Sequence, residues 1–286
     1  MNENQTQKVY RGKARVRKEN KRPKASRVGK KQSFWDDVPS MASKGVIGST
    51  EPPSSTPSIG AIVPTWNEED IIEGTLQSLR GDGIGNVVVV DGGSNDQTRL
   101  RARPLASQIL ECGGGLFAQL NFAARQAESD VFLFQYADVR FPAGGREAIE
   151  RALESASVVG GAFTLGFHSE RTRYQLIARA ANWRNRWGVG PFGDQSIFVR
   201  AEVFRRLGGF REEALLGDLD LVRRLRREGR FLILKESVEA SVRRWEKNGL
   251  ISTLLSHWWL TLQYLARGGR GTQGQKRAAE RLRTVR

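Results

Sequence analysis

The sequence predicts an α/β protein in which a mainly parallel sheet is flanked by helices. Short apolar runs at 59–64, 87–90 and 131–134 have the composition of buried strands. Residues 71–79 and 116–127 carry apolar side chains at helical spacing. Strands that alternate with helices in this way are typical of a parallel sheet with helices packed on its faces.

The first strand is predicted to end at Pro64, and a helix follows it. Asn67 is a plausible N-cap for that helix. Glu68, Glu69 and Asp70 would then lie in its first turn, where acidic side chains favour the helix dipole. Glycines from residue 81 to residue 85 end this helical pattern.

Polar residues follow several of the predicted strands. The run 87–90 ends at Asp91, and the turn after it carries another helix-start signal. A further strand is predicted at 108–112, and Asp138 follows the run 131–134. Ligands of such sheets bind beyond the carboxyl ends of the strands. The sequence therefore predicts a binding site that includes Asp91, Asp138 and the residues after Pro64.

The charge of the chain lies at its two ends. The 286 residues carry a net charge of +15. Residues 1–32 hold a net +10 and residues 265–286 a net +6, whereas 58–264 holds only +1. We predict four segments: a disordered basic tail and linker at 1–57, a folded α/β domain at 58–248, an amphipathic helix at 249–267 and a basic tail at 268–286.

The ends of the chain leave two interpretations open. The basic tails are either simply solvated or attracted to anionic lipid, at about 1 kcal/mol per basic residue. The uncharged stretch 249–266 contains several Ser and Thr residues, so it predicts an amphipathic helix rather than a membrane span. That helix either docks on the domain or lies in a bilayer interface. Nucleic-acid binding is disfavoured, because the tails have few aromatic residues and no known module.

Other classes of protein are excluded by composition and motif. A single cysteine, Cys112, excludes a disulfide framework and fits a cytoplasmic protein, where a buried small apolar side chain is its expected role. His168 and His257 lack zinc-ligand spacing. The glycines form neither G-x-G-x-x-G nor a Walker A loop, so dinucleotide oxidoreduction and P-loop hydrolysis lose support. No early apolar run of signal-peptide type is present.

Six segments together resemble glycosyltransferase family 2 of GT-A fold, a Rossmann-like architecture. They are 62–69, 89–98, 136–142, 193–199, 208–210 with the residues around Asp218, and 240–246. The later motifs resemble a bacterial subgroup of arsenosugar-biosynthesis-type enzymes, which is similar to carotenoid-acid (diaponeurosporenoate) glycosyltransferases. The resemblance covers about residues 59–267, and it implies an enzyme that uses a nucleotide-sugar donor, with UDP-sugars favoured.

The resemblance also implies roles for particular residues. Asp91 would accept hydrogen bonds from the nucleotide base, and Asp138 would hold Mg²⁺ or Mn²⁺ against the donor diphosphate. Asp218 would be the base of an inverting direct displacement, although it is also a candidate N-cap for a helix at 219–227. The expected donor-binding residues are Pro64, Thr65, Asn67, Glu68, Asp91, Gly92, Gln119, Asn121, Asp194, Gln195, Arg243 and Arg244. Residues 193–195 are equally compatible with a tight turn.

The chain departs from the family pattern at several positions. Ala137 replaces the first acid of the metal motif, and Gly217 replaces the glutamate before the base. Leu116 and Ala118 stand where the subgroup has arginines. If those arginines contact the diphosphate, their loss removes charge-assisted hydrogen bonds of about 1.5–3 kcal/mol each. These changes favour weaker or altered donor binding.

Three functions are therefore carried forward. The first is an inverting glycosyltransferase that acts on a hydroxyl or carboxyl acceptor, lipid-like or carotenoid-like, at the cytoplasmic membrane face. The second is a catalytically weakened nucleotide-sugar-binding scaffold with polybasic tails. The third, a nucleotidyltransferase of related fold, lacks the expected Gly-rich basic loop after the first strand. Trp183 and Trp187 are expected on the acceptor side, with core packing an alternative for Trp183.

Overall fold

The computed structural model describes residues 56–212, 214, 216–243, 246, 259 and 261–262. Nearly all of the predicted N-terminal tail, most of the predicted helix at 249–267, the C-terminal tail and Arg244 lie outside the described residues. The predictions made for those segments are therefore not tested by the structure.

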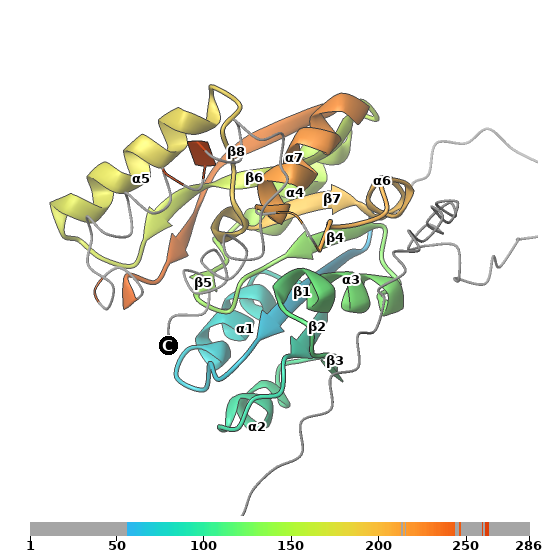
Figure 1. Ribbon diagram of the computed structural model, residues 1–286, viewed down its shortest axis with the longest axis vertical. Helices are drawn as coiled ribbons and strands as arrows, with labels where there is room; N and C mark the ends of the chain where they lie inside the picture. The colour runs from blue at the N-terminus through green and yellow to red at the C-terminus, as the bar shows by residue number, and fades with distance from the viewer. Residues whose placement is uncertain are drawn as a thin grey trace, which may run out of the picture.

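An eight-stranded sheet runs through the described part of the chain, in the order β3-β2-β1-β4-β7-β6-β8-β5 (Figure 1). The first four strands in this order are mutually parallel, β7 is antiparallel to both β4 and β6, and β8 is parallel to β6 and antiparallel to β5. This architecture confirms the predicted fold class. The strands are β1 (Ile59–Thr65), β2 (Asn86–Asp91), β3 (Gln108–Glu111), β4 (Val131–Phe134), β5 (Val139–Arg140), β6 (Val158–Phe167), β7 (Ile197–Arg200) and β8 (Arg230–Ala240).

Helices cover both faces of the sheet, because its central strands are apolar on both sides. In β1, Ala61 and Val63 join the core beneath α1, α2, α4 and α5, whereas Ile62 joins the core beneath α3, α6 and α7. The two helical layers thus bury the sheet between them. The helices are α1 (Ile72–Gly81), α2 (Thr98–Ala102), α3 (Leu116–Gln126), α4 (Gly145–Leu153), α5 (Thr172–Asn185), the 3₁₀ helix η1 (Gly193–Gln195), α6 (Ala201–Arg206) and α7 (Gly217–Glu228).

The start of α1 differs from the prediction. The helix begins at Ile72, and the carbonyl of Glu68 accepts hydrogen bonds from the amides of Ile71 and Ile72 in a turn before it. Asn67 has φ of +49°, a left-handed conformation that asparagine tolerates better than most residues. The prediction that Asn67 caps α1 is therefore wrong, because the chain first makes this turn to reach the neighbouring loop.

Candidate active site

The loops after β1 and β2 are joined by hydrogen bonds, and both leave the same edge of the sheet. Ser94 Oγ accepts from the amide of Asn67 at 2.8 Å, and the Asn67 side-chain oxygen accepts from the amide of Asn95 at 2.7 Å. Thr98 Oγ1 accepts from the amide of Glu68 at 2.7 Å. The sequence-predicted residues of these two loops thus form one connected structure.

Asp91 is the centre of that structure. Its side chain is fully buried. Oδ2 accepts from the amides of Gly93 and Ser94 at 3.0 and 2.8 Å, and Oδ1 accepts from the hydroxyls of Ser94 and Thr65 at 2.5 and 3.1 Å. Arg99 adds a cation, with Nε 3.9 Å from Oδ2. This carboxylate therefore anchors the loop, and its expected contact with a nucleotide base stays a prediction.

Gly92 and Gln119 lie against each other beside this loop. The amide of Gly92 donates to the carbonyl of Thr65 at 2.8 Å. A Cβ added at Gly92 would collide with Nε2 of Gln119, so the side chain of Gln119 lies directly against Gly92. The two residues, predicted separately from β2 and α3, are thus neighbours in the fold.

Asn121, which is predicted to bind the donor, has a structural role in the fold. Its amide nitrogen donates to the carbonyl of Phe210, and its amide oxygen accepts from the Phe210 amide, both at 2.9 Å. The side chain is buried. Asn121 therefore ties α3 to the turn after α6, and its contact with the donor stays a prediction.

Asp138 lies half-buried in a tightly held turn between β4 and β5. Gln135 Nε2 donates to the carbonyl of Val139 at 2.6 Å, and Gln135 Oε1 accepts from Ser196 Oγ at 2.6 Å. The carbonyl of Asp138 accepts from the amide of Ser241 at 2.8 Å, directly after β8. Sequence reasoning missed Gln135 and Ser196, because a lone Gln or Ser in an apolar stretch has no distinctive motif.

Asp218 is brought beside this turn by the antiparallel pairing of β4 and β7. Phe134 is paired with Ile197, so the residues before β7 lie next to those after β4. Gly193 accordingly packs against Tyr136, whose ring leaves no space for a Cβ there. The amide of Gly193 donates to Asp218 Oδ2 at 3.0 Å. Asp218 is thus linked through Gly193 to the segment that carries Asp138.

The helix-cap alternative for Asp218 is wrong. The N-cap of α7 is Leu216, and Asp218 lies in the first turn of the helix. Its Oδ1 accepts from the amide of Leu219 at 3.0 Å, and the side chain is buried. Asp220 points elsewhere, as expected from its position on the helix, and pairs with Arg224 at 2.8 Å.

Arg184 is a site residue that sequence reasoning missed. It comes from α5, and its guanidinium lies over the ring of Phe192 at 4.4 Å. Burial lowers the pKa of Arg184, and the nearby carboxylates of Asp194 and Asp218 act in the opposite direction. The arginine of α5 therefore supplies a positive charge beside the candidate base. A single arginine in an arginine-rich segment gave no signal for this role.

The segment 193–195 forms the 3₁₀ helix η1, which confirms the tight-turn interpretation. Gln195 is fully buried, with Nε2 donating to the carbonyl of Phe163 at 2.8 Å and Oε1 accepting from Asn185 at 3.2 Å. The Gln195 side chain therefore holds η1 against β6 and α5, and its contact with the donor stays a prediction. Asp194 is half-buried and faces the charge of Arg184.

Arg243 and Glu68 meet although 175 residues separate them in the chain. Arg243 Nη2 donates to Glu68 Oε2 at 2.6 Å, and Nη1 lies 3.9 Å from Asp70. The pairing of β5 with β8 explains this contact, because it places the residues after β8 at the edge of the sheet where the β1 loop emerges. Two residues predicted for donor binding are thus brought together by the fold.

The departures at Gly217 and in the start of α3 are neighbours in space. A Cβ at Gly217 would lie 2.5 Å from Cε2 of Phe117. The ring of Phe117 is stacked on Phe210, with centroids 5.2 Å apart and an interplanar angle of 21°. The apolar side chain of Phe117 therefore fills the space that a glutamate at 217 would need. Gly217 and Phe117, which lies between the departures at Leu116 and Ala118, thus form one packing unit.

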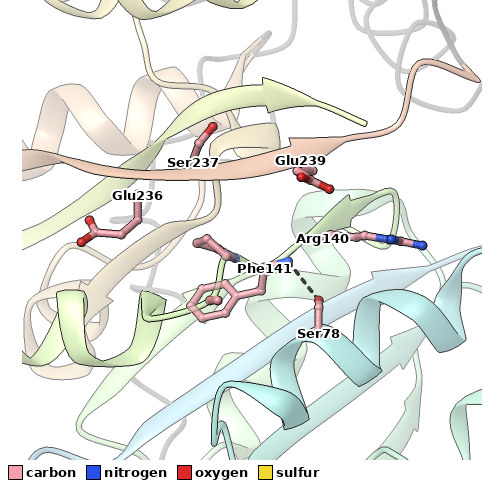
Figure 2. A pocket seen from close by; sticks show the side chains of 8 residues that line it. Ser78, Arg140, Phe141, Glu236, Ser237 and Glu239 are labelled. Carbon is pink, nitrogen blue, oxygen red and sulfur yellow. Dashed lines mark hydrogen bonds between the residues drawn. The ribbon is translucent and has the colours of Figure 1, made fainter. Parts of the chain in front are cut away.

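Two hollows lie away from these residues. One, of about 400 Å³, lies between α1, the β5–α4 connection and β8 (Figure 2). Its wall includes Arg140, Glu236 and Glu239, and the Ser78 hydroxyl accepts from the Phe141 amide at 2.9 Å. The other, of about 620 Å³, lies between α2 and β3. Neither hollow is lined by Asp138 or Asp218.

The described residues do not by themselves form a cluster of metal ligands. They contain no group of three or more His, Cys, Asp or Glu side chains placed to hold a metal ion. Asp138 is a single carboxylate on an ordered turn. This donor set still suits Mg²⁺, which is commonly bound through one or two carboxylates together with substrate phosphates.

Comparisons with known proteins identify the family. A profile described as glycosyl transferase family 2 matches residues 61–208, slightly more than half of the chain. The chain therefore belongs to glycosyl transferase family 2. A segment of 69 residues is 35% identical to glycosyltransferase AglJ of Haloferax volcanii. That match covers 24% of this chain and 22% of the relative, so the chain spans only a small part of that protein's length.

Solved structures show the same GT-A fold. The mannosyltransferase PcManGT of Pyrobaculum calidifontis, in complex with GDP-Man and Mn²⁺, is similar with a TM-score of 0.58 and 22% identity, over 82% of this chain and 72% of that one. Glucosyl-3-phosphoglycerate synthase of Mycobacterium tuberculosis, with Mn²⁺ and UDP, gives a TM-score of 0.53 and 18% identity, over 76% and 82%. These likenesses establish the fold. In the described part of the chain, no helix is both long and apolar enough to cross a membrane.

Proposed function

We propose that this protein is an inverting glycosyltransferase that moves a sugar from a nucleotide-sugar donor to an acceptor hydroxyl or carboxyl group. The proposal rests mainly on one observation. Asp218 is buried at the edge of the sheet, and its Oδ2 is held by the amide of Gly193 next to the Tyr136–Asp138 segment. A candidate base and a candidate metal ligand are thus carried by adjoining, well-ordered segments.

In the proposed reaction, Asp218 takes the proton of an acceptor hydroxyl. The acceptor oxygen then attacks the anomeric carbon from the side opposite the nucleotide diphosphate, which leaves with the bonding electron pair. The Gly193 hydrogen bond holds the carboxylate in place beside the guanidinium of Arg184. A carboxylic acid acceptor would already be ionised near neutral pH, so it would barely need this base.

Asp138 is the residue we propose to hold a divalent cation, Mg²⁺ or Mn²⁺. Such an ion, when bound, neutralises negative charge on the departing diphosphate. The backbone of the turn that carries Asp138 is held by the bond from Gln135 to the Val139 carbonyl and by the bond from Ser241 to the Asp138 carbonyl. The donor diphosphate would complete the coordination sphere. Arg243 and Glu68, which are paired at 2.6 Å, are two further residues that we propose to contact the donor.

The metal role can be tested with Asp138→Ala. We expect the variant to fold normally but to lose the Mn²⁺-dependent part of UDP binding in isothermal titration, because the proposed protein ligand is gone. Glu128→Ala removes a carboxylate from an exposed position and is the matched control. Equal UDP affinity of Asp138→Ala and of the unchanged protein, with and without Mn²⁺, would exclude Asp138 as the metal ligand.

The proposal also specifies the sugar donor, the acceptor and the location of the reaction in the cell. We propose UDP-sugars as donors, a lipid-like or carotenoid-like acceptor, and action at the cytoplasmic face of the membrane, with 58–248 as the catalytic domain. The tails 1–57 and 268–286 and the segment 249–267 would assist the approach to anionic lipid. A panel of nucleotide sugars, screened first by thermal shift and then by transfer to alcohol and carboxylate acceptors, tests each of these points.

A weakened nucleotide-sugar-binding scaffold is the second candidate. The filling of the Gly217 site by Phe117 favours it, because the family's glutamate is replaced there by an apolar ring. A scaffold would bind UDP-sugars yet neither hydrolyse nor transfer them with Mn²⁺. Turnover that Asp218→Asn abolishes would instead support the enzyme.

A further inference from the structure

The outward face of α5 carries a line of large apolar side chains. Leu176, Trp183 and Trp187 are 58%, 59% and 70% exposed. Their spacing of seven and four residues places them along one side of the helix and its final turn. The two indole rings form an edge-to-face pair with centroids 5.7 Å apart. We call these three residues the α5 stripe, and its exposure excludes core packing as the role of Trp183.

The charged side chains in and next to α5 are arginines, of which Arg171 pairs with Glu246 and Arg184 faces Asp194. Residues 171–187 contain five arginines and no Asp or Glu. Arg173, Arg179 and Arg186 are exposed, and Arg179 and Arg186 form no ion pair within the part of the chain that the structure describes. An exposed apolar line between unneutralised guanidinium groups is a surface suited to an anionic, partly apolar partner.

We propose that the α5 stripe docks this domain onto an anionic lipid bilayer. Indole rings favour the interface between headgroups and acyl chains, and arginines beside them favour anionic headgroups. A second copy of the chain is a poorer occupant, because a two-fold contact would bring two arginine-rich faces together. The C-terminal residues 265–286, with a net charge of +6, would also be repelled.

The position of α5 relates this surface to the candidate active site. The helix ends at Asn185, and Arg184 in its last turn lies near Asp218. Docking through α5 would therefore bring Asp218, the candidate base, to the side of the domain that faces the lipid. This consequence rests on the proposed function, whereas docking itself does not. Figure 1 places α5 at the opposite end of the domain from α2.

A site-directed spin label tests the docking directly and needs no enzyme activity. Cys112 is the chain's one cysteine, so Cys112→Ser gives the full chain a background free of thiols. Leu176→Cys places a label on the α5 stripe. Leu100→Cys places the control label on α2, where Leu100 is 66% exposed. The labelled proteins are mixed with vesicles of phosphatidylcholine alone or with phosphatidylglycerol, and collisions with oxygen and with a water-soluble nickel complex are measured.

On phosphatidylglycerol vesicles we expect the label at 176 to become shielded from nickel and accessible to oxygen, whereas the label at 100 stays in water. Three results would overturn the proposal: no binding to these vesicles, binding with both labels exposed to water, or shielding of the label at 176 without vesicles. The last result would indicate that a second copy or residues 249–267 cover the stripe.

Binding strength gives an independent check. Each basic residue close to an anionic surface contributes about a fivefold change in the partition constant. Arg179→Gln combined with Arg186→Gln should therefore weaken binding to phosphatidylglycerol vesicles by about 25-fold. Arg227→Gln with Arg230→Gln removes the same charge from α7 and β8 and should have a much smaller effect. Equal losses in the two double variants would mean that net charge, and not α5, determines binding.

Discussion

Replacement of Asp91 separates a structural role from a ligand-binding role. In the folded protein its Oδ2 accepts from the amides of Gly93 and Ser94, and its Oδ1 accepts from the hydroxyls of Ser94 and Thr65. Asp91→Ala removes all four acceptor interactions. In Asp91→Asn, one oxygen can still accept from the two amides, and the new NH₂ group can face the hydroxyls, which rotate to accept.

The size of the destabilisation depends on whether each hydrogen-bond donor can find another acceptor once Asp91 is replaced. Gly93 is exposed, so its amide regains water. The amide of Ser94 is buried, and leaving it unsatisfied costs about 1–3 kcal/mol. With the loss of a charge-assisted bond, we expect Asp91→Ala to destabilise the domain by about 3 kcal/mol. For a domain of this size that lowers Tm by about 6–12 °C, whereas Asp91→Asn should cost only about 1 kcal/mol.

Thermal unfolding followed by circular dichroism measures the Tm of both variants, and isothermal titration measures UDP affinity of the folded protein. Asp70→Ala is the control, since Asp70 is an exposed carboxylate of the neighbouring loop. If Asp91→Ala kept its Tm but bound UDP more weakly, the carboxylate would be a ligand contact, and the reasoning from its four hydrogen bonds would be refuted.

Three further predictions follow from other contacts. Asp218→Asn should lower turnover on an alcohol acceptor about 10²–10⁴-fold with little change in the donor Michaelis constant; full steady-state activity would remove Asp218 from the mechanism. Gly217→Glu should lower the urea midpoint, because its Cβ would lie 2.5 Å from the Phe117 ring, and Phe117→Ala should partly restore it; no rescue would argue against the clash. Hydrogen bonds from Ser58, through its hydroxyl and amide, lower the pKa of Asp130. The stability they add is present above the unfolded pKa of about 3.9 and is lost as pH falls through the folded value. Ser58→Ala should therefore destabilise the domain at pH 6 more than at pH 2, and an equal loss at both values would contradict this linkage.

Much of the fold was determined by local sequence pattern. The apolar runs at 59–64, 87–90 and 131–134 became β1, β2 and β4, because residues that are apolar on both sides of a strand are stable only between two helical layers. The parallel orientation of these strands was predicted because helices connect them along the chain. The sequence also placed Asp91 and Asp138 at strand ends, since that position depends only on where each apolar run stops.

What those side chains do was decided by tertiary contacts. Asp91, Asn121 and Gln195 are polar residues of suitable type, yet each is buried and bonded to partners that the sequence could not indicate: Thr65 lies 26 residues from Asp91, Phe210 lies 89 residues from Asn121, and Phe163 lies 32 residues from Gln195. The Arg243–Glu68 pair and the approach of Arg184 to Asp218 likewise depend on the order of the strands. A local pattern records the burial preference and backbone conformation of a segment, but hydrogen-bond partners are set by which segments the sheet places side by side.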